Sequence, residues 1–200
     1  MVLGHKFSAR NFWSEVRQSN ATVIQYVGET LRYLLANPPS PLDTDNKVRL
    51  AFGNGLRPDV WDKFKERFDV ETIAEFYSAT EGTSGSWNYS SNSFASGAIG
   101  RNGLIAELLL GKELAVVKVD WETEQPWRNP KTGLCEKVPR GELGELLYAV
   151  DANNIEEKFS GYFKNQKAND SKIMRDAIKK GDAWFRTGDV VRWDSEGRCE

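Results

Sequence analysis

Three short segments carry residue types that could bind a nucleotide or a metal ion. Residues 76–82 read Phe-Tyr-Ser-Ala-Thr-Glu-Gly and follow a predicted strand. A tyrosine ring such as that of Tyr77 can stack on a base, and the Thr80 hydroxyl can donate to a phosphate oxygen. A carboxylate such as Glu81 can hold Mg²⁺. The simpler alternative for this segment is a surface turn with a core tyrosine.

The other two segments are residues 53–58, Gly-Asn-Gly-Leu-Arg-Pro, and residues 184–189, Trp-Phe-Arg-Thr-Gly-Asp. The first follows a predicted strand and opens a predicted helix. Glycines there let a ligand approach the backbone, and the helix N-terminus offers unpaired N–H groups. In the second, the two oxygens of Asp189 can accept both hydroxyls of a ribose. Each segment alone also fits an ordinary turn.

The elements that must position the first two segments alternate along residues 1–80. Helical patterns cover residues 9–18, 29–36 and 58–68, and strand patterns cover 22–26, 48–52 and 72–76. Such alternation predicts a parallel sheet covered by helices, with ligands bound beyond the carboxyl ends of its strands. We therefore expect an α/β fold for this part of the chain.

The pattern changes from about residue 83. Serine and glycine are frequent over residues 83–103, which favours an extended loop. Strands are predicted at 114–119, 144–150 and 190–193, with one amphipathic helix at about 169–179. We expect antiparallel or β-barrel-like structure here, and we divide the chain into an α/β part, residues 1–96, and a β-rich subdomain, residues 97–200.

Composition excludes several classes of function. The net charge is −2, with 27 Lys and Arg against 29 Asp and Glu, so nothing favours nucleic acid as a partner. Cys135 and Cys199 form neither a zinc pattern nor a disulfide framework, and we expect reduced cysteines in an intracellular protein. With His5 as the single histidine, no histidine-based triad can form. We expect no targeting or transmembrane segment in these residues, so any membrane contact would be peripheral or lie outside them.

Taken together, the three segments resemble the AMP-binding, adenylate-forming superfamily. Residues 6–13, 25–34 and 52–58, together with 75–82 and 185–190, narrow the resemblance to the fatty acid transport protein / very-long-chain acyl-CoA synthetase family, and the glycine pairs in 97–101 and 141–146 also fit. The resemblance extends over essentially the whole chain and implies an internal fragment of the large N-terminal domain of such an enzyme. The family's phosphate loop and small C-terminal domain have no counterpart here. We therefore expect the isolated chain to be poorly soluble or partly unfolded, and to lack ligase activity.

The resemblance also implies roles for individual residues. Tyr77 would stack on adenine, Thr80 would bind the α-phosphate, Glu81 would hold Mg²⁺, and Asp189 would take the ribose hydroxyls; Thr80 and Glu81 are the expected catalytic residues. The wall between adenine and the acyl group would comprise Gly53, Asn54 and Gly55. With less support, Tyr26, Gly28 and Glu29 match the segment near the acyl entrance.

The activity implied is ATP-dependent activation of a long- or very-long-chain fatty acid through acyl-AMP, coupled to fatty acid uptake. ATP, Mg²⁺ and coenzyme A would be required, and the whole protein would lie at the endoplasmic reticulum, peroxisome, lipid droplet or plasma membrane. Two alternatives stay open. One is another adenylating enzyme, such as an activator of amino acids or bile acids, and the other is a non-catalytic remnant.

Overall fold

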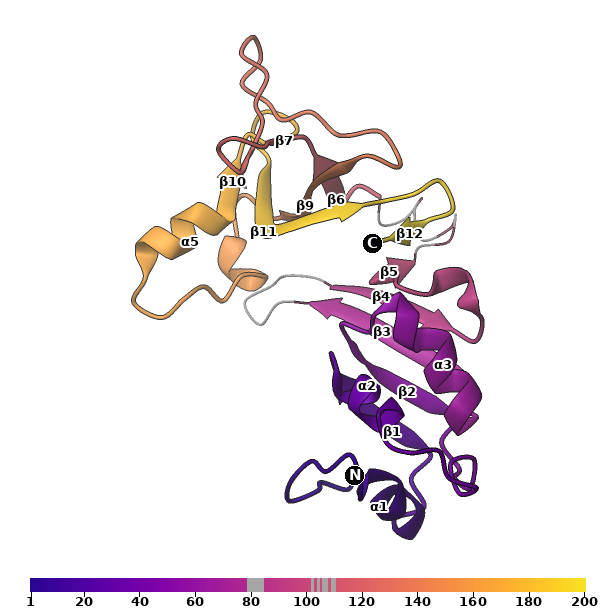
Figure 1. Cartoon of the computed structure of the whole chain (residues 1–200). Helices are drawn as coiled ribbons and strands as arrows, with labels where there is room; N and C mark the ends of the chain where they lie inside the picture. Colours follow the sequence, from indigo (N-terminus) through magenta and orange to yellow (C-terminus); the bar gives the residue numbers. More distant parts are fainter. Residues whose placement is uncertain (79–84, 102, 104, 106–107, 109–110) are drawn as a thin grey trace. The chain divides into compact units, whose positions relative to one another are not determined.

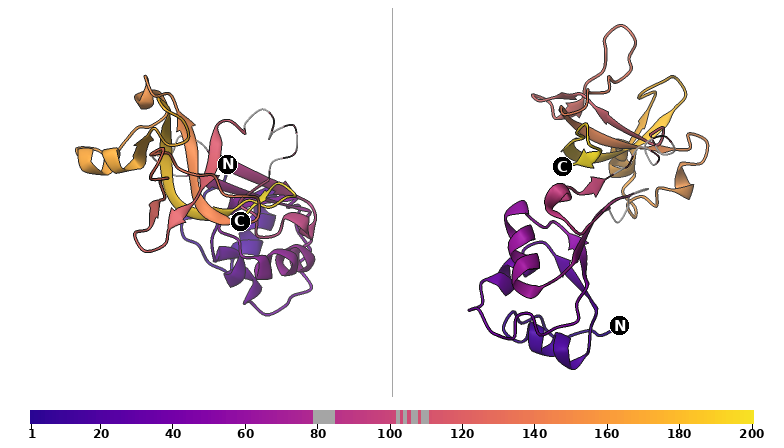
Figure 2. Two further views of the ribbon diagram at one scale, coloured as in Figure 1. Left: turned by 90° about the horizontal axis from the view of Figure 1, so that it is seen from above. Right: turned by 90° about the vertical axis from the view of Figure 1, so that its right-hand side faces the viewer.

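The computed structural model describes residues 1–78, 85–101, 103, 105, 108 and 111–200. The chain divides into two compact units (Figures 1 and 2). The N-terminal unit comprises Met1–Tyr77 and Ser86–Arg101, and the C-terminal unit comprises Ser78–Gly85 and Asn102–Glu200. In the described part of the chain, no helix has the length and apolar character needed to cross a membrane.

The N-terminal unit contains a four-stranded sheet in the order β1-β2-β3-β4. Its strands are β1 (Val23–Val27), β2 (Leu50–Asn54), β3 (Thr72–Ser78) and β4 (Gly85–Ser90). The first three strands run parallel to one another. Three helices, α1 (Phe12–Gln18), α2 (Thr30–Leu35) and α3 (Pro58–Phe68), accompany the sheet, and α2 contacts both β1 and α3 (Figure 1). The predicted α/β fold with a parallel sheet is confirmed.

Helix α3 shows how local sequence and packing agree. Pro58 occupies the first turn, where its missing N–H costs nothing, and Asp69 ends the helix in a left-handed conformation with φ 53°. Trp61, Phe64 and Phe68 are fully buried. Phe68 also packs against Trp13 of α1, in a tilted arrangement with ring centroids 4.5 Å apart. Each such side chain contributes roughly 1.5–3 kcal/mol through burial, so this aromatic cluster ties α1 and α3 into the core.

The prediction of an extended loop over residues 83–103 is wrong. Strand β4 lies within it, followed by the 3₁₀ turn η1 (Ser93–Ala95) and the short strand β5 (Gly100–Arg101). Asn88 of β4 is buried, and its amide donates to the carbonyls of Ala95 and Ala98 at 2.7 and 2.8 Å. These contacts close the serine-rich segment onto its own strand, which composition alone does not reveal.

The C-terminal unit is built on an antiparallel sheet in the order β10-β11-β9-β6. The strands are β6 (Leu114–Val117), β9 (Leu143–Val150), β10 (Ile173–Arg175) and β11 (Ala183–Arg192). The shorter elements are β7 (Val119–Asp120), β8 (Gln125–Pro126), η2 (Ile155–Glu157), α5 (Gln166–Lys172) and β12 (Arg198–Cys199). Antiparallel structure is as predicted, and the described strands form an open sheet rather than a closed barrel.

The helix predicted at residues 169–179 ends early. Helix α5 stops at Lys172, and the apolar residues Ile173 and Met174 lie in β10, which pairs with β11. The carboxylate of Asp182 accepts the backbone N–H groups of Ala177, Ile178 and Lys179 at 2.7–3.0 Å. These bonds fix a tight connection between the two strands. The helical spacing of apolar residues was a misleading signal. The N–H groups of residues 177–179 bind Asp182, which lies outside the predicted helix.

We predict that Asp182→Asn lowers the free energy of unfolding by about 1–3 kcal/mol, because the amide group cannot accept every N–H now bound to the carboxylate. The Trp184 indole N–H is a further donor to this group, at 2.7 Å. Equilibrium denaturation followed by tryptophan fluorescence measures the loss. The matched control is Asp170→Asn on exposed α5, for which a change within about 0.5 kcal/mol is expected.

The effect of Asp182 should also depend on pH. Burial by itself raises the pKa of this carboxyl, but the hydrogen bonds from Trp184 and the three backbone N–H groups outweigh it and lower the pKa. A lowered pKa contributes stability above the ordinary value of about 4, and this contribution is lost as the pH falls through the folded-state pKa. The stability gap between wild type and Asp182→Asn should therefore shrink in acid. A gap that stays constant from about pH 7 to about pH 2.5 would contradict this account.

Candidate functional site

The carboxyl ends of β1 and β2 bring together two groups of residues that the sequence predicted separately. In the parallel register, Tyr26 lies opposite Gly53. Just beyond the strands, the N–H of Gly28 donates to the carbonyl of Asn54 at 2.7 Å. A Cβ built on Gly55 would lie 3.5 Å from the Gly28 Cα. The predicted acyl-entrance segment and the predicted glycine wall are therefore in direct contact.

The neighbouring strand β1 leaves no room for a side chain at Gly53. A Cβ at this position would lie 2.1 Å from the Tyr26 carbonyl oxygen and 2.7–2.8 Å from carbons of the Tyr26 ring. Gly55 has φ +75°, a conformation that glycine adopts without strain. The sequence prediction explained these glycines by close approach of a ligand. At Gly53, the group that approaches is the tyrosine of the neighbouring strand.

Glu75 of β3 is the residue at this edge that the sequence prediction missed. It is 2% exposed and lies opposite Gly53 in the register of β2 and β3. Its Oε2 accepts the N–H of Gly55 at 2.9 Å, and its Oε1 accepts the N–H of Leu56 at 3.1 Å. Oε1 also accepts the hydroxyl of Tyr26. A signal was present, because a glutamate interrupts an otherwise buried strand, and buried carboxylates need donors.

Burial is the largest influence on the pKa of the Glu75 carboxyl. It raises the pKa of the Glu75 carboxyl, while the hydrogen bonds from Tyr26, Leu56 and Gly55 act in the opposite direction. Burial, followed by the neighbouring Glu75 charge and the hydrogen bond to it, raises the pKa of Tyr26. Tyr26 therefore stays a neutral donor at physiological pH, and its hydroxyl is committed to Glu75.

Tyr77 lies two residues after Glu75 in β3, and side chains at this spacing in a strand share a face. Tyr77 is half-buried. Phe76, on the other face, packs against Trp87 of β4 with ring centroids 5.5 Å apart. Tyr77 thus shares a face of β3 with Glu75, the residue that binds the turn following β2. Thr80 and Glu81, the predicted phosphate and Mg²⁺ residues, lie outside the described residues.

Asp189 lies in the C-terminal unit, at an irregularity of β11. The pairing of β11 with β9 shifts register here, and Gly188 has φ +82°. The hydroxyl of Thr187 donates to the Leu146 carbonyl at 2.8 Å and accepts the N–H of Asp189 at 3.0 Å. The Lys172 ammonium donates to the Thr187 carbonyl at 2.9 Å. This bulge projects Asp189 as an exposed side chain on a fixed backbone.

A buried ion pair anchors the strand immediately before that bulge. Arg186 donates to both oxygens of Glu145 at 2.9 and 2.8 Å, and its third nitrogen donates to Gln125 at 2.7 Å. Glu145 is buried, so its charge is compensated by the fork-like guanidinium. The sequence prediction missed this pair, because its members are 41 residues apart in the chain.

Glu29 is exposed at the start of α2 and forms an ion pair with Arg32. The same guanidinium donates to both oxygens of Asp59, at 2.8 and 3.1 Å, at the start of α3. Glu29 therefore belongs to a surface network that links two helices beside the Gly28 turn. In the described part of the chain, no three His, Cys, Asp or Glu side chains gather as a metal site would require.

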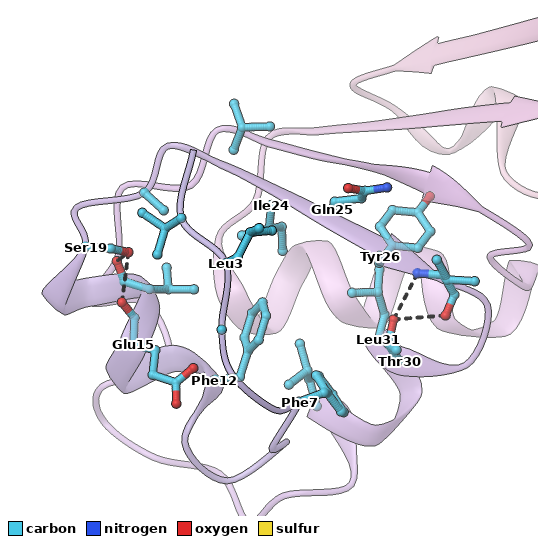
Figure 3. Close-up of a pocket in the computed structure, with 17 residues that line it drawn as sticks. Leu3, Phe7, Phe12, Glu15, Ser19, Ile24, Gln25, Tyr26, Thr30 and Leu31 are labelled. Carbon is cyan, nitrogen blue, oxygen red and sulfur yellow. Dashed lines mark hydrogen bonds between the residues drawn. The ribbon is translucent and has the colours of Figure 1, made fainter.

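An apolar pocket of about 420 Å³ adjoins Tyr26. Figure 3 shows Leu3 of the N-terminal segment, Phe12 of α1, Ile24 of β1 and Leu31 of α2 around it. The Tyr26 ring lines this pocket, although its hydroxyl is bound by Glu75. The lining is suited to an alkyl or aromatic group rather than to a charged one.

Comparison with known proteins places this geometry in context. The chain is 42% identical over 199 residues to the "very long-chain fatty acid transport protein" of Saccharomyces cerevisiae, covering 98% of this chain and 30% of that protein. It is 39% identical to "isopenicillin N epimerase component 1" of Hapsidospora chrysogena, covering 98% of this chain and 32% of that protein. The chain thus spans about a third of the length of the relatives that it matches.

Solved structures agree on the fold. The adenylation domain AlmE of Vibrio cholerae, in complex with glycyl-adenosine-5'-phosphate, superposes with a TM-score of 0.62 at 20% identity, over 94% of this chain and 32% of that chain. A benzoate CoA ligase from Burkholderia xenovorans gives 0.61 at 18% identity, over 96% and 33%. The AMP-binding enzyme family matches residues 1–153, which is most of the chain. The chain therefore belongs to the AMP-binding enzyme family, whose fold is that of adenylate-forming enzymes.

Proposed function

We propose that the whole protein uses ATP to activate a long- or very-long-chain fatty acid, forming acyl-AMP and then acyl-CoA. The observation that carries this proposal is the 42% identity, over 98% of the chain, to a protein named as a very long-chain fatty acid transporter. In the first step, a carboxylate oxygen attacks the α-phosphorus of ATP and pyrophosphate leaves. In the second, the coenzyme A thiol attacks the acyl carbon and AMP leaves.

The nucleotide roles follow the resemblance and are supported by the local geometry. Tyr77 offers a half-buried ring for adenine next to the Gly53–Gly55 turn. Asp189 is exposed on a rigid bulge, as a group that accepts two ribose hydroxyls must be. We assign Thr80 to the α-phosphate and Glu81 to Mg²⁺ from the resemblance alone. A bound Mg²⁺ would neutralise phosphate charge.

The acyl roles are supported by the pocket beside β1. Tyr26 contributes its ring to that pocket, and Gly28 turns the chain immediately after the strand. An alkyl chain gains roughly 0.8 kcal/mol for each methylene that it buries, so an apolar lining favours long acids. Glu29, the residue before the lining residue Thr30, is an exposed carboxylate paired with Arg32.

A second candidate is activation of a different acid. The relative named "isopenicillin N epimerase component 1" is 39% identical to the chain, nearly as similar as the fatty acid transport protein. Membership of the family thus supports the adenylating chemistry more strongly than the identity of the acid. A non-catalytic remnant is the remaining alternative. By resemblance, we place the whole protein at the endoplasmic reticulum, peroxisome, lipid droplet or plasma membrane.

We predict that the soluble, folded fraction of the 200-residue chain binds Mg·ATP saturably in a calorimetric titration and that the chain forms no acyl-CoA by itself. Asp189→Ala should weaken binding about tenfold, because it removes a charged acceptor of two hydroxyls. The matched control, Asp170→Ala on exposed α5 of the same unit, should bind as wild type does. No saturable heat with the folded wild-type chain would favour the remnant.

The acid can be tested separately with non-hydrolysable acyl-adenylate analogues. We predict that a sulfamoyl-adenosine carrying a long alkyl chain binds at least about tenfold more tightly than one carrying glycine, since two buried methylenes already supply that difference. Competition against a fluorescent AMP derivative measures both affinities. Equal affinities, or preference for the glycyl compound, would contradict the fatty acid assignment and leave the adenylating chemistry standing.

A further inference from the structure

We propose that Glu75 is the positioning residue of the nucleotide site, holding the Gly53–Leu56 turn in its binding conformation through two hydrogen bonds from the turn backbone and one from Tyr26. This inference rests on the proposed function, because the turn matters to catalysis only if it separates adenine from the acyl group. Glu75 thereby joins the residues of the nucleotide site, although it has no assigned contact with substrate. Glu75 acts through the backbone of the turn and through Tyr26.

The first step of the argument is the connection across three strands. Tyr26 of β1, Gly53 of β2 and Glu75 of β3 lie side by side in the parallel register. The absence of a side chain at Gly53 leaves room for the Tyr26 ring, whose carbons would otherwise be 2.7–2.8 Å from a Cβ. The ring thus lies over β2, and its hydroxyl reaches the carboxylate on β3.

The second step is the backbone of the turn itself. Gly55 and Leu56 follow β2 and precede α3, so their N–H groups have no partner in a strand or helix. The two carboxylate oxygens of Glu75 accept these N–H groups at 2.9 and 3.1 Å. Because Glu75 is 2% exposed, water does not compete for these bonds. A single buried side chain therefore fixes the turn.

The third step is that no neutral side chain can replace it. The three groups that hydrogen-bond to the carboxylate are all donors: one hydroxyl and two backbone N–H groups. In Glu75→Gln, either orientation of the amide turns its NH₂ toward a backbone N–H. One of the two turn residues then loses its acceptor and the turn relaxes. The shape of the side chain is retained, so packing is disturbed little.

The experiment compares Glu75→Gln with wild type by amide hydrogen exchange and by Mg·ATP titration of the 200-residue chain. We expect exchange at Gly55 and Leu56 to rise at least about tenfold, with amides in the centre of β2 unchanged, and affinity for Mg·ATP to fall about tenfold. The matched control is Asp43→Asn. It weakens a half-buried ion pair with Arg67, 2.8 Å apart in the same unit, and should leave both readouts as in wild type.

The outcomes are distinct. Wild-type affinity in a folded Glu75→Gln variant overturns the inference, as does exchange that rises uniformly over the sheet. If Glu75→Gln does not fold, the wild-type protein provides the test. Fast exchange of the Gly55 and Leu56 amides in wild type also overturns the inference. If the folded wild-type chain binds no Mg·ATP, the result favours the non-catalytic remnant over the proposed function, and the nucleotide part of the inference fails with it. The exchange measurement then still shows whether Glu75 holds the turn.

Discussion

The parallel pairing of β1, β2 and β3 is the constraint on which the candidate site of the N-terminal unit depends. Parallel strands end at one edge, and their register sets which residues meet there. Here, Tyr26, Gly53 and Glu75 form a row across the three strands. A slip of one residue would turn the Glu75 side chain to the other face and leave the Gly55 and Leu56 N–H groups without an acceptor. Strand register and turn geometry are thus parts of one arrangement.

Much of this unit could be predicted from sequence because its signals are local. Pro58, Asp59 and the spacing of Trp61, Phe64 and Phe68 specify α3 without reference to any other element. Strand β4 and the end of α5 could not be predicted in this way. Both depend on side-chain hydrogen bonds to nearby backbone groups that neither composition nor apolar spacing reveals: Asn88 binds the carbonyls of Ala95 and Ala98, and Asp182 binds the N–H groups of residues 177–179.

The candidate site likewise has features that the sequence could predict and features that it could not. The glycines at 53 and 55 were visible as candidates, because a glycine directly after a strand usually marks a tight turn or a close approach to the backbone. The reason for Gly53 was not visible, since it lies in the Tyr26 ring of the neighbouring strand, distant in the sequence. Glu75 and the Arg186–Glu145 pair were missed for the same cause. Residue type alone does not indicate which donors a buried carboxylate will meet.

The family of the chain is also better supported than the identity of its substrate, and the two parts of the candidate site differ in a way that explains this. The proposed nucleotide side of the N-terminal unit consists of a backbone turn, two glycines and the buried Glu75 carboxylate, which the strand register links to one another. The apolar pocket beside β1 consists of side chains such as Leu3, Phe12 and Leu31, which can be exchanged for others of similar volume without disturbing the sheet. Relatives near 40% identity accordingly carry different names, a very long-chain fatty acid transport protein and an isopenicillin N epimerase component.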